Sequence, residues 1–375
     1  MLFFVGNTTK NYTICYPILI LHNFKVLEFP WTLLLSIEIV LHVVAACYVF
    51  KCIYITVSIR TFHKNMTALV VGFACQWFES ILANAMSWPY ETGFWTLRGL
   101  DPSLSGDAIK QWWTDDESQM IHVVSYQEDI YFFIAGFIKI HYLISMSTVL
   151  MIISVERSFA CYFLSDYEQK SRIWIAVLII SLNQAFNLIA TIFLYFKTFH
   201  FIWMVLINFI PNALGIGLLL SAQHFNLKVT ETIENFANPN HYTLAARFQA
   251  KENIRCFQMI RTVVLAGLLL IAFGFTIAFI LFYDLFPQLD TLLNAMIQGA
   301  MSLGPLVICP TMIYSVESWR KFDLTDNILI CKRAKERIGR RSAEIMPMRK
   351  GSVMKNELIR KDTDTYFNQL TASWT

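Results

Sequence analysis

Long uninterrupted runs of apolar residues dominate the pattern of this chain. A bilayer core about 30 Å thick requires about 20 apolar residues in a helix that crosses it. Seven runs reach that length, at residues 30–57, 66–87, 130–155, 173–196, 199–222, 262–283 and 292–314. Stretches of about ten residues that alternate apolar and polar, as in a transmembrane β-barrel, do not occur. The pattern therefore predicts an all-α membrane protein with a bundle of seven transmembrane helices.

The runs divide the chain into three parts: an N-terminal segment at 1–29, a membrane domain at 30–314 and a tail at 315–375. The shortest predicted loop separates the fourth and fifth runs around Lys197 and Thr198. We count two spans there, because a run of some fifty residues is too long for one. Charged residues make up 15% of the chain and apolar residues 56%, whereas soluble domains carry about 25% charged residues. The bilayer is therefore the expected environment, and the net charge of +3 is too small to indicate a nucleic-acid partner.

The distribution of Lys and Arg over the loops predicts the orientation, since cytoplasmic loops carry an excess of both. Five lie in the N-terminal segment and in the second, fourth and sixth loops. Ten lie in the first, third and fifth loops, and four more follow closely after the last span. The second loop carries eight acidic residues and two basic ones. The N-terminus is therefore predicted to lie outside the cell and the tail inside, in the plasma membrane.

Two kinds of covalent modification fit this orientation. Asn7 and Asn11 each begin an Asn-x-Thr acceptor for N-glycosylation within the predicted outer segment. Cys331, in the predicted cytoplasmic tail, follows the last span closely enough to be a candidate for palmitoylation.

An acidic–Arg pair stands at the predicted cytoplasmic end of the third span. Glu156 can neutralise the neighbouring Arg157 in one state and release it to a cytoplasmic partner in another, which would make a two-state switch. The alternative is that these charges only mark the membrane interface, where charged side chains are common.

Seven spans with an outer N-terminus and a basic inner tail are the layout of G-protein-coupled receptors. The string VERSFACYFLSDYE at Val155–Glu168 resembles the nematode serpentine receptor class epsilon family of chemoreceptors, as do FHKN at Phe62–Asn65 and DTDTYFNQL at Asp362–Leu370. The resemblance implies a receptor that binds an external small molecule and signals to a heterotrimeric G protein, and it favours the switch role for Glu156 and Arg157. It also suggests the cilia of sensory neurons as the location.

Ionisable residues inside the predicted spans are candidates for a functional site, because insertion costs about 2.5–3.5 kcal/mol for each charge. The candidates are Glu38, Glu79, Lys139, His42 and His141. Lys139 precedes Arg157 by eighteen residues, which is close to five helical turns, so both are predicted to face the bundle interior. Glu79 is the predicted partner of Lys139, with Glu38 second. The group is either a structural ion pair or part of the wall of a ligand cavity.

Other functional classes fit the sequence less well. A ligand-gated channel of the insect odorant-receptor kind also has seven spans, but its N-terminus lies inside the cell. A transporter would show internal repeats with paired broken helices, which the sequence lacks. No zinc-protease motif, pair of facing aspartates or nucleophile with a base is present, so no enzyme, cofactor or metal site is predicted.

Overall fold

The computed structural model describes residues 2–7, 10–16, 29, 31–59, 61–92, 94–95, 97, 120–123, 127, 129–163, 172–198, 201–234, 244–283 and 285–324. The statements below concern this part of the chain. Met1–Asp323 form one compact unit. Cys331 lies outside the described residues, as do the side chains of Asn7 and Asn11.

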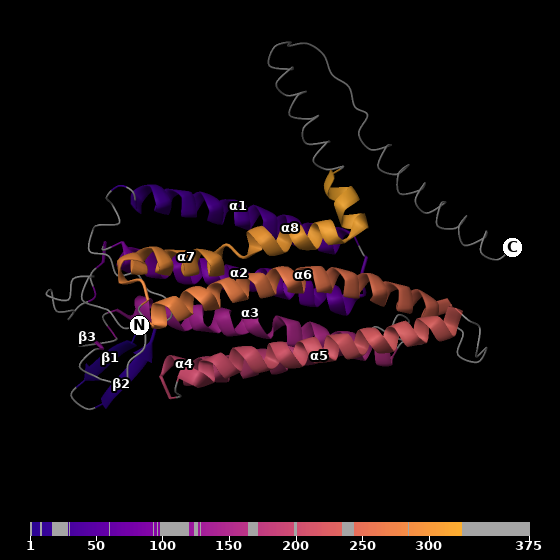
Figure 1. Cartoon of the computed structure of the whole chain (residues 1–375), viewed down its shortest axis with the longest axis horizontal. Coiled ribbons are helices and arrows are strands. Elements are labelled where there is room, and N and C mark those ends of the chain that lie inside the picture. The colour runs from indigo at the N-terminus through magenta and orange to yellow at the C-terminus, as the bar shows by residue number, and fades with distance from the viewer. Residues whose placement is uncertain are drawn as a thin grey trace, which may run out of the picture. The chain divides into compact units, whose positions relative to one another are not determined.

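Seven helical segments are long and apolar enough to cross a membrane, as the sequence predicts. The first six are α1 (Trp31–Ser58), α2 (Lys64–Glu91), α3 (Ile130–Tyr162), α4 (Ile173–Tyr195), α5 (Phe201–Glu234) and α6 (Leu244–Phe282). The seventh consists of α7 (Asp290–Ser302) and α8 (Pro305–Ser315), which follow the short 3-10 helix η4 (Pro287–Leu289). Successive segments run in opposite directions along one bundle (Figure 1).

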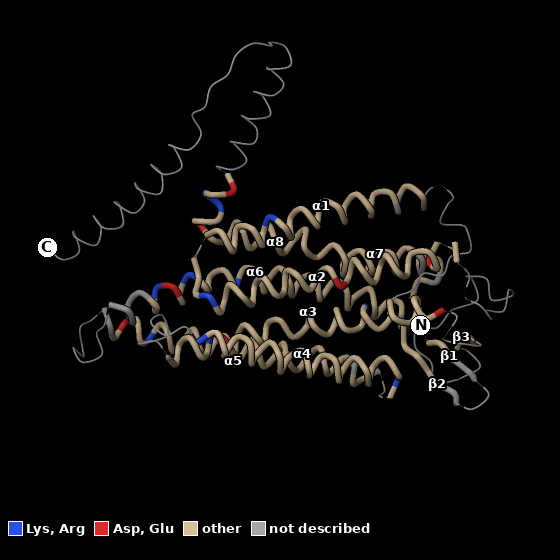
Figure 2. Tube along the Cα trace, turned by 180° about the vertical axis from the view of Figure 1, so that it is seen from behind, with Lys and Arg blue, Asp and Glu red and all other residues tan. Residues whose placement is uncertain are grey.

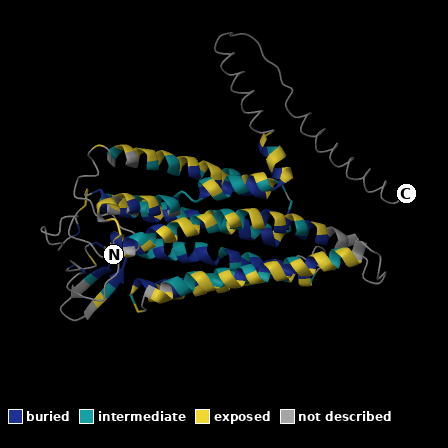
Figure 3. Cartoon of the chain, in the orientation of Figure 1, coloured by how far each residue is buried: buried dark blue, intermediate teal, exposed yellow. Residues whose placement is uncertain are grey.

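Helix α3 forms the centre of the bundle and packs against α2, α4 and α5. The buried surface is concentrated on α3, whereas the outer faces of α1, α5 and α6 are exposed (Figure 3). Those outer faces are apolar, with residues such as Val43, Leu214 and Leu269 exposed on them. Such faces are suited to contact with lipid tails, because burying them in lipid removes apolar surface from water.

A small three-stranded sheet lies at the end of the bundle where α3 begins, which we call the sheet end. Strands β1 (Leu2–Asn7) and β2 (Lys10–Cys15) form an antiparallel hairpin, and β3 (Ile121–Val123) pairs with β1 in parallel. The sequence analysis predicted no strand here. A partial signal was present, since two short runs rich in strand-forming residues, such as Phe, Val, Thr, Tyr and Ile, lie close together in the sequence.

Among the described residues, most Lys and Arg lie toward the opposite end, where α3 and α5 finish and α6 begins (Figure 2). We call this the Arg157 end. The helices are also longer here than the apolar runs predicted. α3 continues past Val155 to Tyr162, α5 continues to Glu234 and α6 begins at Leu244. Hydropathy detects only the stretch inside the bilayer, whereas a helix can continue into water with polar residues.

The seventh span is interrupted, although its apolar run is continuous. Helix α7 ends at Ser302 and α8 begins at Pro305, with Leu303 and Gly304 between them. Proline has no backbone N–H, so Pro305 cannot bond to the carbonyl four residues earlier, and it suits the first position of a new helix. Pro305 therefore suits the start of α8, but the prolines inside α2, α5 and α8 show that a proline alone does not break a helix here.

Candidate functional site

Arg157 and Glu156 form a bidentate ion pair inside the bundle. The Arg157 Nε donates to Glu156 Oε2 at 2.5 Å, and Nη2 donates to Oε1 at 2.8 Å. Both side chains are 0% exposed. α3 continues to Tyr162, so the pair lies within the helix and not at its end. Two fully buried charges are tolerated only when they are paired and hydrogen-bonded, which this geometry achieves.

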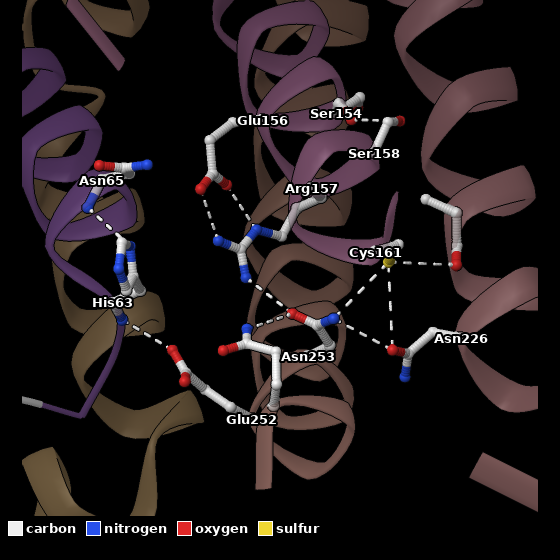
Figure 4. A network of polar contacts seen from close by, with 12 residues as sticks. His63, Asn65, Ser154, Glu156, Arg157, Ser158, Cys161, Asn226, Glu252 and Asn253 are labelled. Carbon is white, nitrogen blue, oxygen red and sulfur yellow. Dashed lines mark hydrogen bonds and ion pairs between the residues drawn. The ribbon is translucent and has the colours of Figure 1, made fainter. Parts of the chain in front are cut away.

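A cluster of amides connects this pair to two further helices (Figure 4). Arg157 Nη1 donates to Asn253 Oδ1 on α6 at 3.2 Å, and Asn253 Nδ2 donates to Asn226 Oδ1 on α5 at 3.0 Å. Gln249 Nε2 also donates to Asn253 Oδ1 at 3.2 Å. Asn253 therefore connects α3 with α5 and α6 through one buried carboxamide.

Cys161 lies one helical turn after Arg157, on the same face of α3. Asn253 Nδ2 donates to its Sγ at 3.6 Å, and Sγ itself donates to the Ala222 carbonyl of α5 at 3.7 Å. The sequence analysis singled out neither the thiol nor the amides. A single Asn or Cys has no distinctive pattern along the chain, so no sequence signal could have placed them beside Arg157.

The loop between α1 and α2 is bound to α6 next to this cluster. The His63 backbone N–H donates to Glu252 Oε1 at 2.7 Å, while His63 Nδ1 accepts from the Asn65 backbone N–H at the start of α2. Burial lowers the pKa of His63 below its ordinary value, and the nearby carboxylate of Glu156 partly opposes this. His63 is therefore held mainly neutral at the edge of the Arg157 cluster.

Lys139 pairs with Glu91, so the predicted pairing with Glu79 is wrong. Lys139 Nζ lies 2.9 Å from Glu91 Oε1, and the two side chains are 11% and 9% exposed. Gln298 Nε2 of α7 donates to the second oxygen of Glu91 at 3.3 Å. The error came from the boundary of the second span, which the apolar run placed at Ser87, whereas α2 continues through Glu91. Glu79, about three helical turns earlier on α2, contacts His141 instead.

The other residues predicted for this group make different contacts. His141 Nδ1 lies 2.8 Å from Glu79 Oε2, which connects α3 with α2. His42 Nδ1 contacts the backbone carbonyl of Glu38, one turn earlier in α1. The five residues predicted as one intramembrane group therefore belong to three hydrogen-bonded contacts.

A seven-helix membrane bundle with a buried acidic–Arg pair on its central third helix has the architecture of a serpentine receptor. The family model described as "Sre G protein-coupled chemoreceptor" matches residues 1–375. The chain belongs to this family, whose members are receptors and not enzymes.

Curated relatives from Caenorhabditis elegans agree with this assignment. The chain is 40% identical over 378 residues to serpentine receptor class epsilon-45, with all of both chains covered. It is 28% identical to serpentine receptor class epsilon-38, covering 84% of this chain and 85% of the relative. It is 27% identical to serpentine receptor class epsilon-27, covering 91% of each chain. The protein is thus a multi-pass, GPCR-like chemoreceptor.

Proposed function

We propose that this receptor binds an external small molecule at the sheet end and signals to a heterotrimeric G protein at the Arg157 end. The sheet end then faces outward at the plasma membrane, as in a sensory cilium, and the tail is cytoplasmic. The loop charges support this orientation, and membership of the family supports a receptor over a ligand-gated channel.

The observation that carries the proposal is the contact from Arg157 through Asn253 to Asn226. It joins α3, α5 and α6 at a single buried point. A partner that binds at this end can compete for Arg157 only if the helices separate and expose it. Such an element has two discrete arrangements, and ligand and G protein can both bias the equilibrium between them.

The test is a second-messenger assay in cells that express the full chain. The cells are exposed to a panel of volatile alcohols, ketones, carboxylic acids and aromatic compounds, and every active compound is applied again to the Arg157→Ala variant. We expect the response to be lost while surface labelling shows normal delivery. Arg255→Ala is the matched control, because Arg255 is exposed on α6. A normal response from well-delivered Arg157→Ala would contradict a signalling role for this residue.

A further inference from the structure

The ring of Tyr16 is inserted into the bundle at the sheet end. Tyr16 is the first residue after strand β2 and is 0% exposed. Its ring stacks on Phe132 of α3, with centroids 4.4 Å apart and planes 17° from parallel. Phe3 of β1 packs edge-on against it at 6.1 Å. The hairpin thus holds an aromatic side chain against the central helix of the receptor.

The face of α3 that receives this ring has an unusual shape. Phe132, Gly136 and Lys139 follow one another at i, i+4 and i+7, so they lie on one side of the helix. A Cβ added to Gly136 would lie 2.6 Å from Cδ2 and 2.7 Å from Cε2 of Tyr16. No side-chain carbon fits at that distance, so only glycine allows the ring to lie flat on the helix backbone.

Polar groups border the same place. Lys139 Nζ lies 5.6 Å from the centre of the Tyr16 ring, within the range of a cation–π interaction. The same ammonium group pairs with Glu91, which in turn accepts from Gln298 of α7. Burial, and after it the negative charge of Glu91, raise the pKa of Tyr16 well above its ordinary value. The phenol is therefore held neutral beside an ion pair of no net charge.

These features describe a site for a flat ring with a polar substituent, which the chain itself occupies. We propose that the space between Phe132 and Gly136, bordered by Lys139, is the ligand-binding site of the receptor. Its ligands are small phenols or similar aromatic molecules. When no ligand is bound, Tyr16 occupies the site and stabilises the resting state. This rests on the proposed receptor function.

Tyr16 competes effectively with a free ligand for this site, because it is covalently linked to the receptor chain. An occupant linked to its site has an effective concentration in the millimolar range. An external ligand binds only to the fraction of molecules from which Tyr16 has withdrawn, so its apparent affinity falls by that fraction. Removing the ring should therefore raise the affinity for a free phenol by about tenfold or more.

The binding test uses 4-methylphenol, which is the side chain of tyrosine cut at Cβ. The purified full chain in nanodiscs is unfolded thermally with and without this compound. We expect it to raise the midpoint of Tyr16→Ala by roughly 2–4 °C and that of the wild type by much less. The control compound 4-methylcyclohexanol has the same substituents but a puckered ring, and should leave the midpoint unchanged. Equal effects of the two compounds would refute an aromatic site.

Glycine variants locate the site. Adding Gly136→Ala to Tyr16→Ala places a methyl group where the ring lies, and should abolish the effect of 4-methylphenol. Adding Gly72→Ala instead should preserve it, because a Cβ on Gly72 meets nothing within 4 Å. If the Gly136 double variant still responds, the compound binds elsewhere and the proposal is wrong. Should Tyr16→Ala not be delivered, Tyr16→Leu removes the flat ring while keeping an apolar side chain, and the same comparison applies.

A signalling test separates this proposal from the function on which it rests. Tyr16→Ala and Gly136→Ala should both raise basal signalling per surface receptor severalfold, and Gly72→Ala should not. If Glu156→Gln raises basal signalling while Tyr16→Ala and Gly136→Ala do not, Tyr16 has only a structural role in packing. The proposed receptor function is then retained. If no variant signals above the level of untransfected cells, the proposed receptor function is wrong, and so is the proposed role of Tyr16 in signalling. The binding test still decides whether the site binds an aromatic ring.

Discussion

At the scale of single residues, the receptor depends on charges that water does not reach. Arg157 is neutralised by the adjacent Glu156, and three of its nitrogens donate to oxygens of Glu156 and Asn253. A hydrogen bond to a charged group contributes about 1.5–3 kcal/mol. Under the proposed function, removing one partner should therefore change the relative stability of the resting and signalling arrangements.

The first prediction concerns the carboxylate of Glu156. Glu156→Gln keeps the shape of the side chain but leaves Arg157 without its counter-charge in a buried position. We expect basal second-messenger signalling to rise about tenfold or more, because the resting state loses at least one charged hydrogen bond. Glu156→Asp, which retains the charge, should raise it less. Basal signalling of Glu156→Gln equal to that of the wild type would show that the pair does not hold the resting state.

A second prediction at this scale tests which carboxylate partners Lys139. Lys139→Ala leaves Glu91 buried without its counter-charge, which should destabilise the fold by about 3–5 kcal/mol and reduce surface delivery. Exchanging the two charges, Lys139→Glu with Glu91→Lys, should restore much of the delivery. Surface labelling measures both. The matched exchange of Lys139 with Glu79 should not restore delivery, and rescue by that exchange in place of the other would overturn the observed pairing.

At the scale of elements, the break between α7 and α8 needs an external hydrogen-bond donor. The last carbonyls of a helix have no partner within it, and inside a bilayer water cannot replace one. The indole Nε1 of Trp77 on α2 donates to the Ser302 carbonyl at 2.7 Å in a buried position. This bond fixes the broken seventh span to the second.

Trp77→Phe keeps an aromatic ring but removes the hydrogen bond to Ser302. We therefore expect it to destabilise the packing of the seventh span against α2. The free energy of unfolding should fall by about 1–3 kcal/mol, because a buried carbonyl is left without a hydrogen-bond donor. A lower thermal midpoint of the purified chain would show it. Trp174→Phe is the control, because Trp174 is 60% exposed on α4, and its midpoint should not change. An unchanged midpoint for Trp77→Phe would mean that other groups satisfy Ser302.

At the scale of the whole molecule, the two ends of the bundle are chemically different. The sheet end has a hairpin, while most Lys and Arg lie toward the Arg157 end (Figure 2). The excess of cytoplasmic basic residues predicts that the hairpin is outside the cell.

The corresponding prediction uses the acceptors on the hairpin. Asn7 ends β1 and Asn11 lies in β2, so both should be glycosylated if this end is outside. Peptide N-glycosidase should then increase the gel mobility of the wild type but not of Asn7→Gln with Asn11→Gln. Asn65 also begins an acceptor sequence, but its side chain is buried near the Arg157 end, and Asn65→Gln should have no effect on mobility. A wild-type band that the enzyme leaves unchanged, beside a glycosylated control receptor, would argue against the orientation.

The sequence alone determined the class of fold and the number of spans. Insertion in a bilayer depends on the summed hydropathy of about 20 consecutive residues, which is a local property that can be read along the chain. The same applies to Glu156 and Arg157, because neighbours in sequence stay neighbours in the folded helix.

Only the tertiary structure decided which side chains meet across helices. The sequence placed Lys139 inside the third span, but its partner depended on where α2 ends and on how α2 and α3 are aligned. Asn226 and Asn253 join Arg157, and Tyr16 lies on Gly136, because helix packing brings together residues far apart in the chain. Such contacts depend on the relative positions of whole elements. No pattern within a single segment carries that information, and so the sequence predicted the bundle and singled out Glu156 and Arg157, while the structure supplied their partners.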